Sequence, residues 1–165
     1  MKGIRYLVFN DIASGVVAQT YKTLAAIVAA ATAGHRAALL AVNIGCSDNS
    51  PVDESFNLQV QRVEDVSAGG AGTTTAVSAA QMARPDSYEV DGNITGGHTY
   101  TAEPTTYDAT YPLFNHEFNT RGGFFKEWSF ESAPKIDNDQ LIGILITPRV
   151  ATARNFSGSL TFQEY

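Results

Sequence analysis

The stretch Ser55–Val63, which reads SFNLQVQRV, decides the fold class of this chain. Apolar and amide side chains alternate along it, in the order Phe56, Asn57, Leu58, Gln59, Val60 and Gln61. Successive side chains of a β-strand point to opposite faces, so a period of two indicates a strand with one buried and one exposed face. This stretch therefore predicts a half-buried strand that needs a second layer on its apolar side.

Further strands are expected on both sides of this one, separated by segments rich in Gly, Asn, Asp and Pro. Their predicted ranges are Ile4–Phe9, Ala38–Ile44, Tyr111–Phe118, Phe124–Glu131, Leu141–Thr147 and a final strand around Leu160–Phe162. Many short strands at such spacings are typical of an antiparallel sandwich or barrel. We therefore predict an all-β, antiparallel β-sandwich with long loops.

The run Leu141–Ile146 is apolar at every position except Gly143. A strand of this kind must be covered on both faces. We expect the opposite sheet to cover one face, and a loop or a neighbouring subunit to cover the other. The run is the first candidate for a central strand.

Two segments are harder to interpret. Tyr21–Ala33 fits helical spacing, but its short apolar run fits a buried strand equally well, and the all-β context favours the strand. Ser67–Tyr107 is poor in large aliphatic residues and rich in Gly, Thr and Ser, which predicts exposed functional loops.

We expect a single domain, with residues 1–20 as an N-terminal arm that can supply an edge strand and residues 21–165 as the sandwich.

Charge and composition exclude several classes of function. The formal charge is −6, and the eleven Lys and Arg residues are spread thinly along 165 residues. A nucleic-acid partner or an anionic membrane surface would favour a clustered basic patch, so neither is expected. The longest apolar run, Leu24–Ala31, is too short to span a bilayer. Cys46 is the single cysteine, which excludes an intrachain disulfide.

We predict no catalytic, cofactor or metal site, and therefore no enzyme. The three histidines lack partners at metal-ligand spacing, and neither acidic group matches a calcium-binding loop. These residues are His35, His98 and His116, the loop carboxylates Asp48, Asp53 and Glu54, and the pair Asp137 and Asp139. Cys46 ends an apolar strand, where a buried small thiol is commoner than a nucleophile.

An aromatic group near the C-terminal third is expected to be mostly core. It consists of Phe114, Phe118, Phe124, Phe125, Trp128 and Phe130. Phe125 has the opposite parity to Phe124 and Trp128, so its side chain should point away from the core as an interface anchor or a sugar-stacking platform. A second set of rings, in the central region, suggests a saccharide contact and consists of Tyr88, Tyr100, Tyr107 and Tyr111.

Five short motifs carry a family resemblance. Arg36–Ile44 leads into Gly45-Cys46-Ser47-Asp48, and an alternating strand then ends at Arg62 before the Gly/Thr-rich segment Gly69–Thr75. Phe118-Asn119-Thr120-Arg121-Gly122-Gly123-Phe124 and the terminal Ser157–Glu164 complete the outline. Together these pieces resemble small β-sandwich proteins encoded among the virion genes of tailed bacteriophages and prophages. The segment Met82–Tyr107 departs from that outline.

Members of that group are similar to capsid decoration, or cement, proteins with jelly-roll-like sandwiches. The resemblance implies a structural virion protein on the outer surface of the capsid. Its partners would be the major capsid protein and further copies of itself, in a homo-oligomer that we expect to be a trimer. The alternative is a carbohydrate- or receptor-binding module of a phage head or tail fibre. A small β-barrel hydrolase using Asp/Glu pairs is a third, less favoured interpretation.

Overall fold

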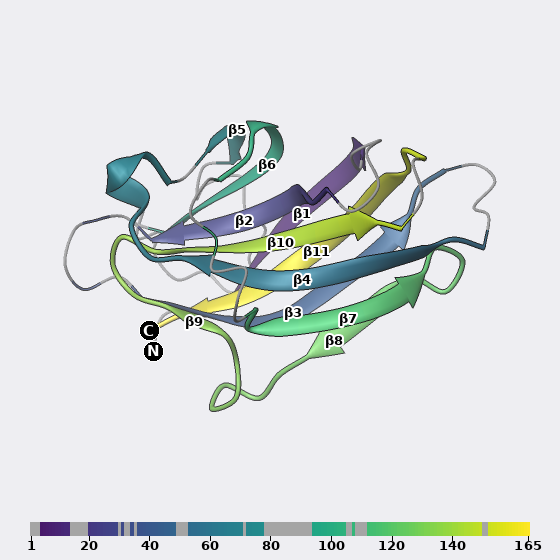
Figure 1. Cartoon of the computed structure of the whole chain (residues 1–165). Coiled ribbons are helices and arrows are strands. Elements are labelled where there is room, and N and C mark those ends of the chain that lie inside the picture. Colours follow the sequence, from purple (N-terminus) through teal and green to yellow (C-terminus); the bar gives the residue numbers. More distant parts are fainter. Residues whose placement is uncertain are drawn as a thin grey trace.

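The computed structural model describes residues 4–13, 20–29, 31, 34, 36–48, 53–70, 72–77, 94–104, 107, 112–149 and 152–165. These residues form two antiparallel sheets packed face to face, which confirms the predicted all-β sandwich (Figure 1). One π-helical turn, Val66–Gly70, interrupts the strands. Within the described part of the chain, no helix has the length and apolarity to cross a bilayer.

The first sheet has the strand order β1-β11-β3-β8, and β9 pairs with β3 beside this path. Its strands are β1 (Ile4–Ala13), β3 (Ala37–Cys46), β8 (Phe124–Glu127), β9 (Lys135–Ile136) and β11 (Asn155–Glu164). The second sheet has the order β5-β6-β2-β10-β4-β7. Its strands are β2 (Lys22–Ala29), β4 (Ser55–Val63), β5 (Thr73–Val77), β6 (Ile94–Ala102), β7 (Phe114–Asn119) and β10 (Leu141–Pro148).

The strand order is that of a jelly roll. The row β1-β11-β3-β8 faces the row β2-β10-β4-β7, and the chain changes sheet between β1 and β2, β2 and β3, β3 and β4, β7 and β8, β9 and β10, and β10 and β11. Eight strands connected in this way form two Greek keys. The strands β5 and β6 are inserted between β4 and β7, and they extend the second sheet beyond β2.

The core lies between the two sheets. The apolar side of Ser55–Val63 is confirmed, because Phe56, Leu58 and Val60 are fully buried in this core. The expected exposure of the polar side is wrong at Asn57 and Gln61, which are buried as well. The ring of Phe56 meets the ring of Phe156 from the first sheet, with centroids 5.0 Å apart. Aromatic side chains such as these bury the most apolar area per residue and dominate the stability of a core.

The central strand is β10, as predicted for Leu141–Ile146. It pairs with β2 on one side and β4 on the other, and all six of these residues are buried. The segment Tyr21–Ala33 contains a strand, β2, and not a helix. A bulge at Leu24 lets consecutive residues of β2 face the core there.

Two of the strands are shorter than predicted. Tyr111–Phe118 contains β7, which begins at Phe114, while Tyr111 itself lies outside the described residues. The strand predicted over Phe124–Glu131 ends at Glu127, because the chain turns where the amide of Ser132 donates to the carbonyl of Ser129 (3.1 Å).

The prediction that Ser67–Tyr107 consists of exposed loops is wrong for Thr73–Val77 and Ile94–Ala102, which form β5 and β6. Residues 78–93 lie outside the described residues. The glycines of β6 made this segment look like a loop. Gly96 faces the core, and a Cβ atom there would lie 3.0 Å from Leu7 of the opposite sheet. The glycine is therefore required by close packing between the sheets.

Strand β1 lies at the edge of the first sheet and pairs with β11. Its side chains Leu7 and Phe9 belong to the core, so residues 4–13 form part of the sandwich. Arg5 and Glu164 form an ion pair of 3.0 Å, and their side chains are only 4% and 3% exposed. This contact joins the first and last strands of the fold.

Candidate functional site

Two of the motifs that carry the family resemblance, Gly45–Asp48 and Phe118–Phe124, lie together at one end of the sandwich. Gly45-Cys46-Ser47-Asp48 ends β3, and Asn155 begins β11 beside it. Asp48 Oδ1 accepts hydrogen bonds from the backbone amide of Asn155 (3.3 Å) and from its Nδ2 (3.1 Å). The acidic residue of this motif therefore fixes the turn that leaves β3 to the start of the last strand.

Arg154 neutralises two of the three loop carboxylates. Its guanidinium donates to both carboxylate oxygens of Glu54, at 2.8 and 3.0 Å, and lies 3.6 Å from Asp48. The hydrogen bond from Arg154 lowers the pKa of the Glu54 carboxyl below its ordinary value. The third carboxylate, Asp53, lies 3.8 Å from Arg121. Among the described residues, no group of three or more potential ligands is arranged to hold a metal ion.

The Phe118–Phe124 motif forms the turn between β7 and β8. Asn119 Oδ1 accepts from the amide of Arg121 (2.8 Å), and the carbonyl of Asn119 accepts from Gly122 (3.1 Å). Gly123 has a φ of +63°, and a Cβ atom there would lie 3.0 Å from the carbonyl oxygen of Ile44. Left-handed backbone and close approach both favour glycine at this position.

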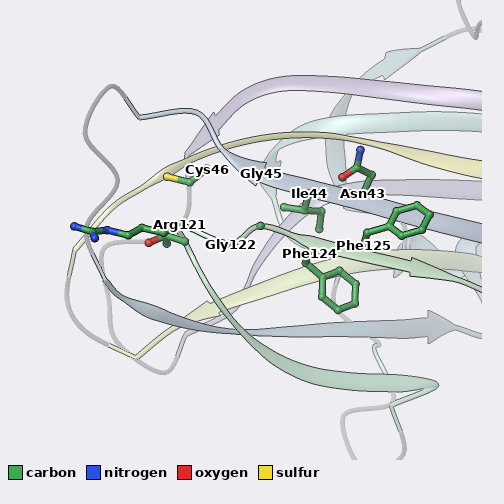
Figure 2. Close-up of a pocket in the computed structure, with 10 residues that line it drawn as sticks. Asn43, Ile44, Gly45, Cys46, Arg121, Gly122, Phe124 and Phe125 are labelled. Atoms are coloured by element: carbon green, nitrogen blue, oxygen red, sulfur yellow. The ribbon is translucent and has the colours of Figure 1, made fainter.

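A groove of about 380 Å³ lies between this turn and the end of β3 (Figure 2). Cys46, Arg121 and Phe125 are among the residues that line it. Burial raises the pKa of the Cys46 thiol, and the thiol donates to Asp48 Oδ2 at 3.7 Å. Asp48, from the same turn, therefore holds the thiol of Cys46 in place.

The aromatic group divides as its parity predicted. Phe118 is buried, and Phe114, Phe124 and Trp128 pack against the core at the edge between the sheets. Phe125 is 66% exposed, and Figure 2 shows its ring directed away from that of Phe124. Phe130 packs on Tyr165, with ring centroids 5.1 Å apart. Phe125 is therefore the ring of this group that is available to a partner.

Phe125 belongs to a larger exposed surface, the outer face of the first sheet. Two adjacent cross-strand rows form it, and we name these eight residues the open face: Val8, Ser159, Asn43, Phe125, Tyr6, Thr161, Ala41 and Glu127. All of them are exposed or half-buried, and Val8 is 52% exposed. Small side chains occupy the middle of both rows, so this face presents low relief between Val8 and Phe125.

The outer face of the second sheet is different, because side chains cover its centre. Tyr107 lies over Gly143 of β10, where a Cβ atom would collide with its hydroxyl. The Tyr107 hydroxyl is 3.2 Å from Thr23 Oγ1, and burial raises the pKa of this tyrosine well above its ordinary value. Tyr100 packs beside it in a small apolar cluster with Ala26, Val63 and Leu141, which we name the covered face together with Tyr107.

This packing corrects the expectation that the tyrosines bind saccharide. Tyr100 is 3% exposed, and Tyr107 forms part of the cover over β10. These two rings therefore cover the outer face of the second sheet, Tyr107 directly over Gly143 and Tyr100 from strand β6. Tyr88 and Tyr111 lie outside the described residues.

The other predicted candidates have local partners. His98 Nδ1 lies 2.8 Å from Thr99 Oγ1, and the ring of His116 contacts the ring of Phe124, with centroids 5.3 Å apart. Asp137 pairs with Arg36 at 3.0 Å. Asp139 accepts hydrogen bonds from the amide and hydroxyl of Ser67, at 2.8 and 2.7 Å. His35 lies outside the described residues.

Sequence reasoning missed Val8 as part of the exposed surface. The signal was present, because Ile4–Phe9 is apolar at positions of both parities, and only one parity can face the core. It also treated the amides Asn57, Gln59 and Gln61 only as the polar side of a strand. The sequence could not show which residues lie beside these amides, because their neighbours on β7 and β10 follow from the pairing of the strands.

No protein-family model matches the chain, and no curated protein matches it. The solved structure of Cocksfoot mottle virus is similar over 98% of this chain and 92% of that chain, at 10% identity and a TM-score of 0.28. An α-amino acid ester hydrolase is similar over 98% of this chain and 24% of that chain, at 7% identity and a TM-score of 0.19. TM-scores this low carry no argument about function.

Proposed function

We propose that this chain is a non-enzymatic structural protein of a virion, a capsid decoration or cement protein that binds the outer surface of the head. The sequence motifs support this role through the family that they resemble. Jelly rolls occur in viral capsid proteins as well as in lectins and other classes. Because one fold hosts many functions, the proposal needs a surface that suits it.

The open face is the observation that carries the proposal. It is a broad sheet surface with small side chains between two exposed apolar residues, Val8 and Phe125. Large exposed apolar side chains on a rigid surface are typical anchors of protein interfaces, and aromatic anchors contribute most. A major capsid protein with a complementary apolar pocket is the partner that this surface fits.

Weak contacts suffice for a cement protein because many copies act together. A docked copy that is also joined to its neighbours rebinds at a high effective concentration, so avidity exceeds the affinity of one interface. Within the described residues, β1 pairs on one side only, with β11, and its other edge has backbone groups available for pairing. We propose that copies associate through such edges in a homo-oligomer, with a trimer as the expected state.

Electron microscopy of purified virions tests the proposal. The expected result is density for this chain at regular positions on the outside of the head, with the open face toward the shell. Light scattering of the purified chain tests the trimer separately. Absence of the chain from purified virions, with all of it in the cytoplasm of the producing cells, would falsify the proposal.

A further inference from the structure

The polar half of the second sheet's outer face forms a groove of about 320 Å³ beside the covered face. Its floor is made of outward-facing residues of three neighbouring strands. The lining side chains are Asn57, Gln59 and Gln61 of β4, Asn115 of β7, Thr147 at the end of β10, and Tyr21 and Arg149 at the rim. We name this surface the amide groove. Its volume lies at the lower end of the range for small-molecule sites.

The amides of the groove are ordered and partly buried, unlike amides on a solvated strand. Asn57 and Gln61 are 7% and 3% exposed. Asn57 Nδ2 donates to Asn115 Oδ1 across the strands, and Gln61 Nε2 donates to Gln59 Oε1, both at 2.5 Å. These contacts fix the orientation of the four amides before any ligand arrives, which lowers the entropy lost on binding.

Gln61 supplies an observation that points to a ligand. Its Oε1 atom is buried, and none of the described residues donates a hydrogen bond to it. Buried acceptors without a donor are rare in folded proteins, and each one asks for an explanation such as a bound group. Gln61 lines the amide groove, so a ligand in this groove that carries a hydrogen-bond donor would suit its Oε1 atom.

The chemistry of the groove selects a neutral saccharide. Amides offer donors and acceptors side by side, as sugar hydroxyls do, while the charged rim residue Arg149 is paired with Glu117. The Tyr21 ring, which also lines the groove, is held in place, because its hydroxyl donates to the carbonyl of Pro104 (3.3 Å) and its ring contacts Tyr107. A fixed aromatic ring beside polar groups suits the apolar face and the hydroxyl edge of a pyranose.

We infer that the amide groove is a binding site for a neutral mono- or disaccharide. The residues that contact the sugar are Gln59, Gln61 and Asn115 through hydrogen bonds, and Tyr21 through stacking. This site goes beyond the proposed role at the capsid, and it lies on the other sheet from the open face. It also differs from the saccharide contact that the sequence suggested for the central tyrosines, because Tyr100 is not one of its contacts.

Saturation-transfer NMR with a panel of neutral hexoses, N-acetylhexosamines and their disaccharides tests the inference on the intact chain. At least one sugar should bind with a Kd of about 1 mM or tighter. Gln59→Leu, which keeps the volume and favours a strand, should weaken that binding about tenfold or more. Asn43→Ala is the matched control, because it removes an exposed amide from the open face, and it should leave sugar binding unchanged.

A second variant, Asn115→Ala, tests the site at a position where a substitution does not disturb the core. Asn115 is exposed, and it lies on an edge strand. This variant should also weaken sugar binding while the circular-dichroism spectrum stays that of the wild type, and the melting temperature should fall slightly because the buried Asn57 Nδ2 loses its acceptor. The inference is overturned if no sugar of the panel binds, or if binding survives in both Gln59→Leu and Asn115→Ala. Either result leaves the proposed capsid role intact, because virion attachment is measured separately through Phe125.

Discussion

The outer faces of the two sheets show how the same kind of strand surface can be used in two ways. The covered face hides β10 under Tyr100 and Tyr107, whose rings fill the space above Ala26 and Gly143. The open face instead presents Val8 and Phe125 to solvent. Apolar residues on the covered face stabilise the fold, whereas those on the open face contribute little to it. The comparison indicates that the open face is available for a partner.

The largest expected effect comes from uncovering β10. Tyr107→Ala should lower the free energy of unfolding by about 3 kcal/mol, because a packed ring and its contacts over Gly143 are lost. Urea denaturation measures the change. Tyr107→Phe keeps the ring and removes only the contact with Thr23, so it should cost about 1 kcal/mol. Equal stability of Tyr107→Ala and the wild type would show that the ring does not cover the strand.

Alkaline pH should weaken the covered face specifically. Burial raises the pKa of Tyr100 and Tyr107 above the ordinary value near 10. A group whose folded pKa is raised stabilises the fold below its unfolded pKa, and this contribution is lost as the pH rises through the folded value. Stability should therefore decline above about pH 10, with tyrosinate absorbance appearing as the chain unfolds.

The double variant Tyr100→Phe, Tyr107→Phe is the control for this titration. It should remove most of the alkaline decline, because phenylalanine has no proton to lose. Early ionisation of all tyrosines without unfolding would contradict the burial of these two hydroxyls.

Removal of the aromatic anchor should affect attachment and not folding. Phe125→Ser is expected to change the free energy of unfolding by less than about 0.5 kcal/mol, because the side chain is exposed. The same change should reduce binding to heads that lack the chain about tenfold or more. Co-sedimentation with such heads measures the affinity. A large loss of stability with unchanged attachment would reverse the roles assigned to the two faces.

The smallest effect is expected at the end of the sandwich where Arg154 pairs with Glu54 and Asp48. The hydrogen bond from Arg154 lowers the pKa of Glu54, so this contact stabilises the fold above the unfolded pKa of about 4.3 and fades as the pH falls through the folded value. Glu54→Gln should flatten the acid limb of a stability profile measured by urea denaturation. Asn43→Ala, on the open face, changes no titratable group and is the control.

The strands with clear alternation were predictable because burial on one face imposes a period of two. Ser55–Val63 and the apolar Leu141–Ile146 correspond to β4 and the central β10. The exposure of Phe125 followed from parity alone. In contrast, β6 was missed, because the requirement for glycine at Gly96 comes from Leu7 on the other sheet. A contact between distant segments leaves no periodic signal in either one.

The candidate surfaces also combine features that the sequence predicts with features that depend on the tertiary structure. Residue types and their alternation determined that this chain forms a sandwich with an exposed aromatic ring and a polar strand face, because those properties depend on neighbours in the sequence. Tertiary structure decided that Tyr107 covers a strand, that Arg154 joins two loops, and that amides from β4 and β7 share one groove. The physical reason is that cross-strand register, which is fixed by packing of the whole core, chooses which side chains become neighbours.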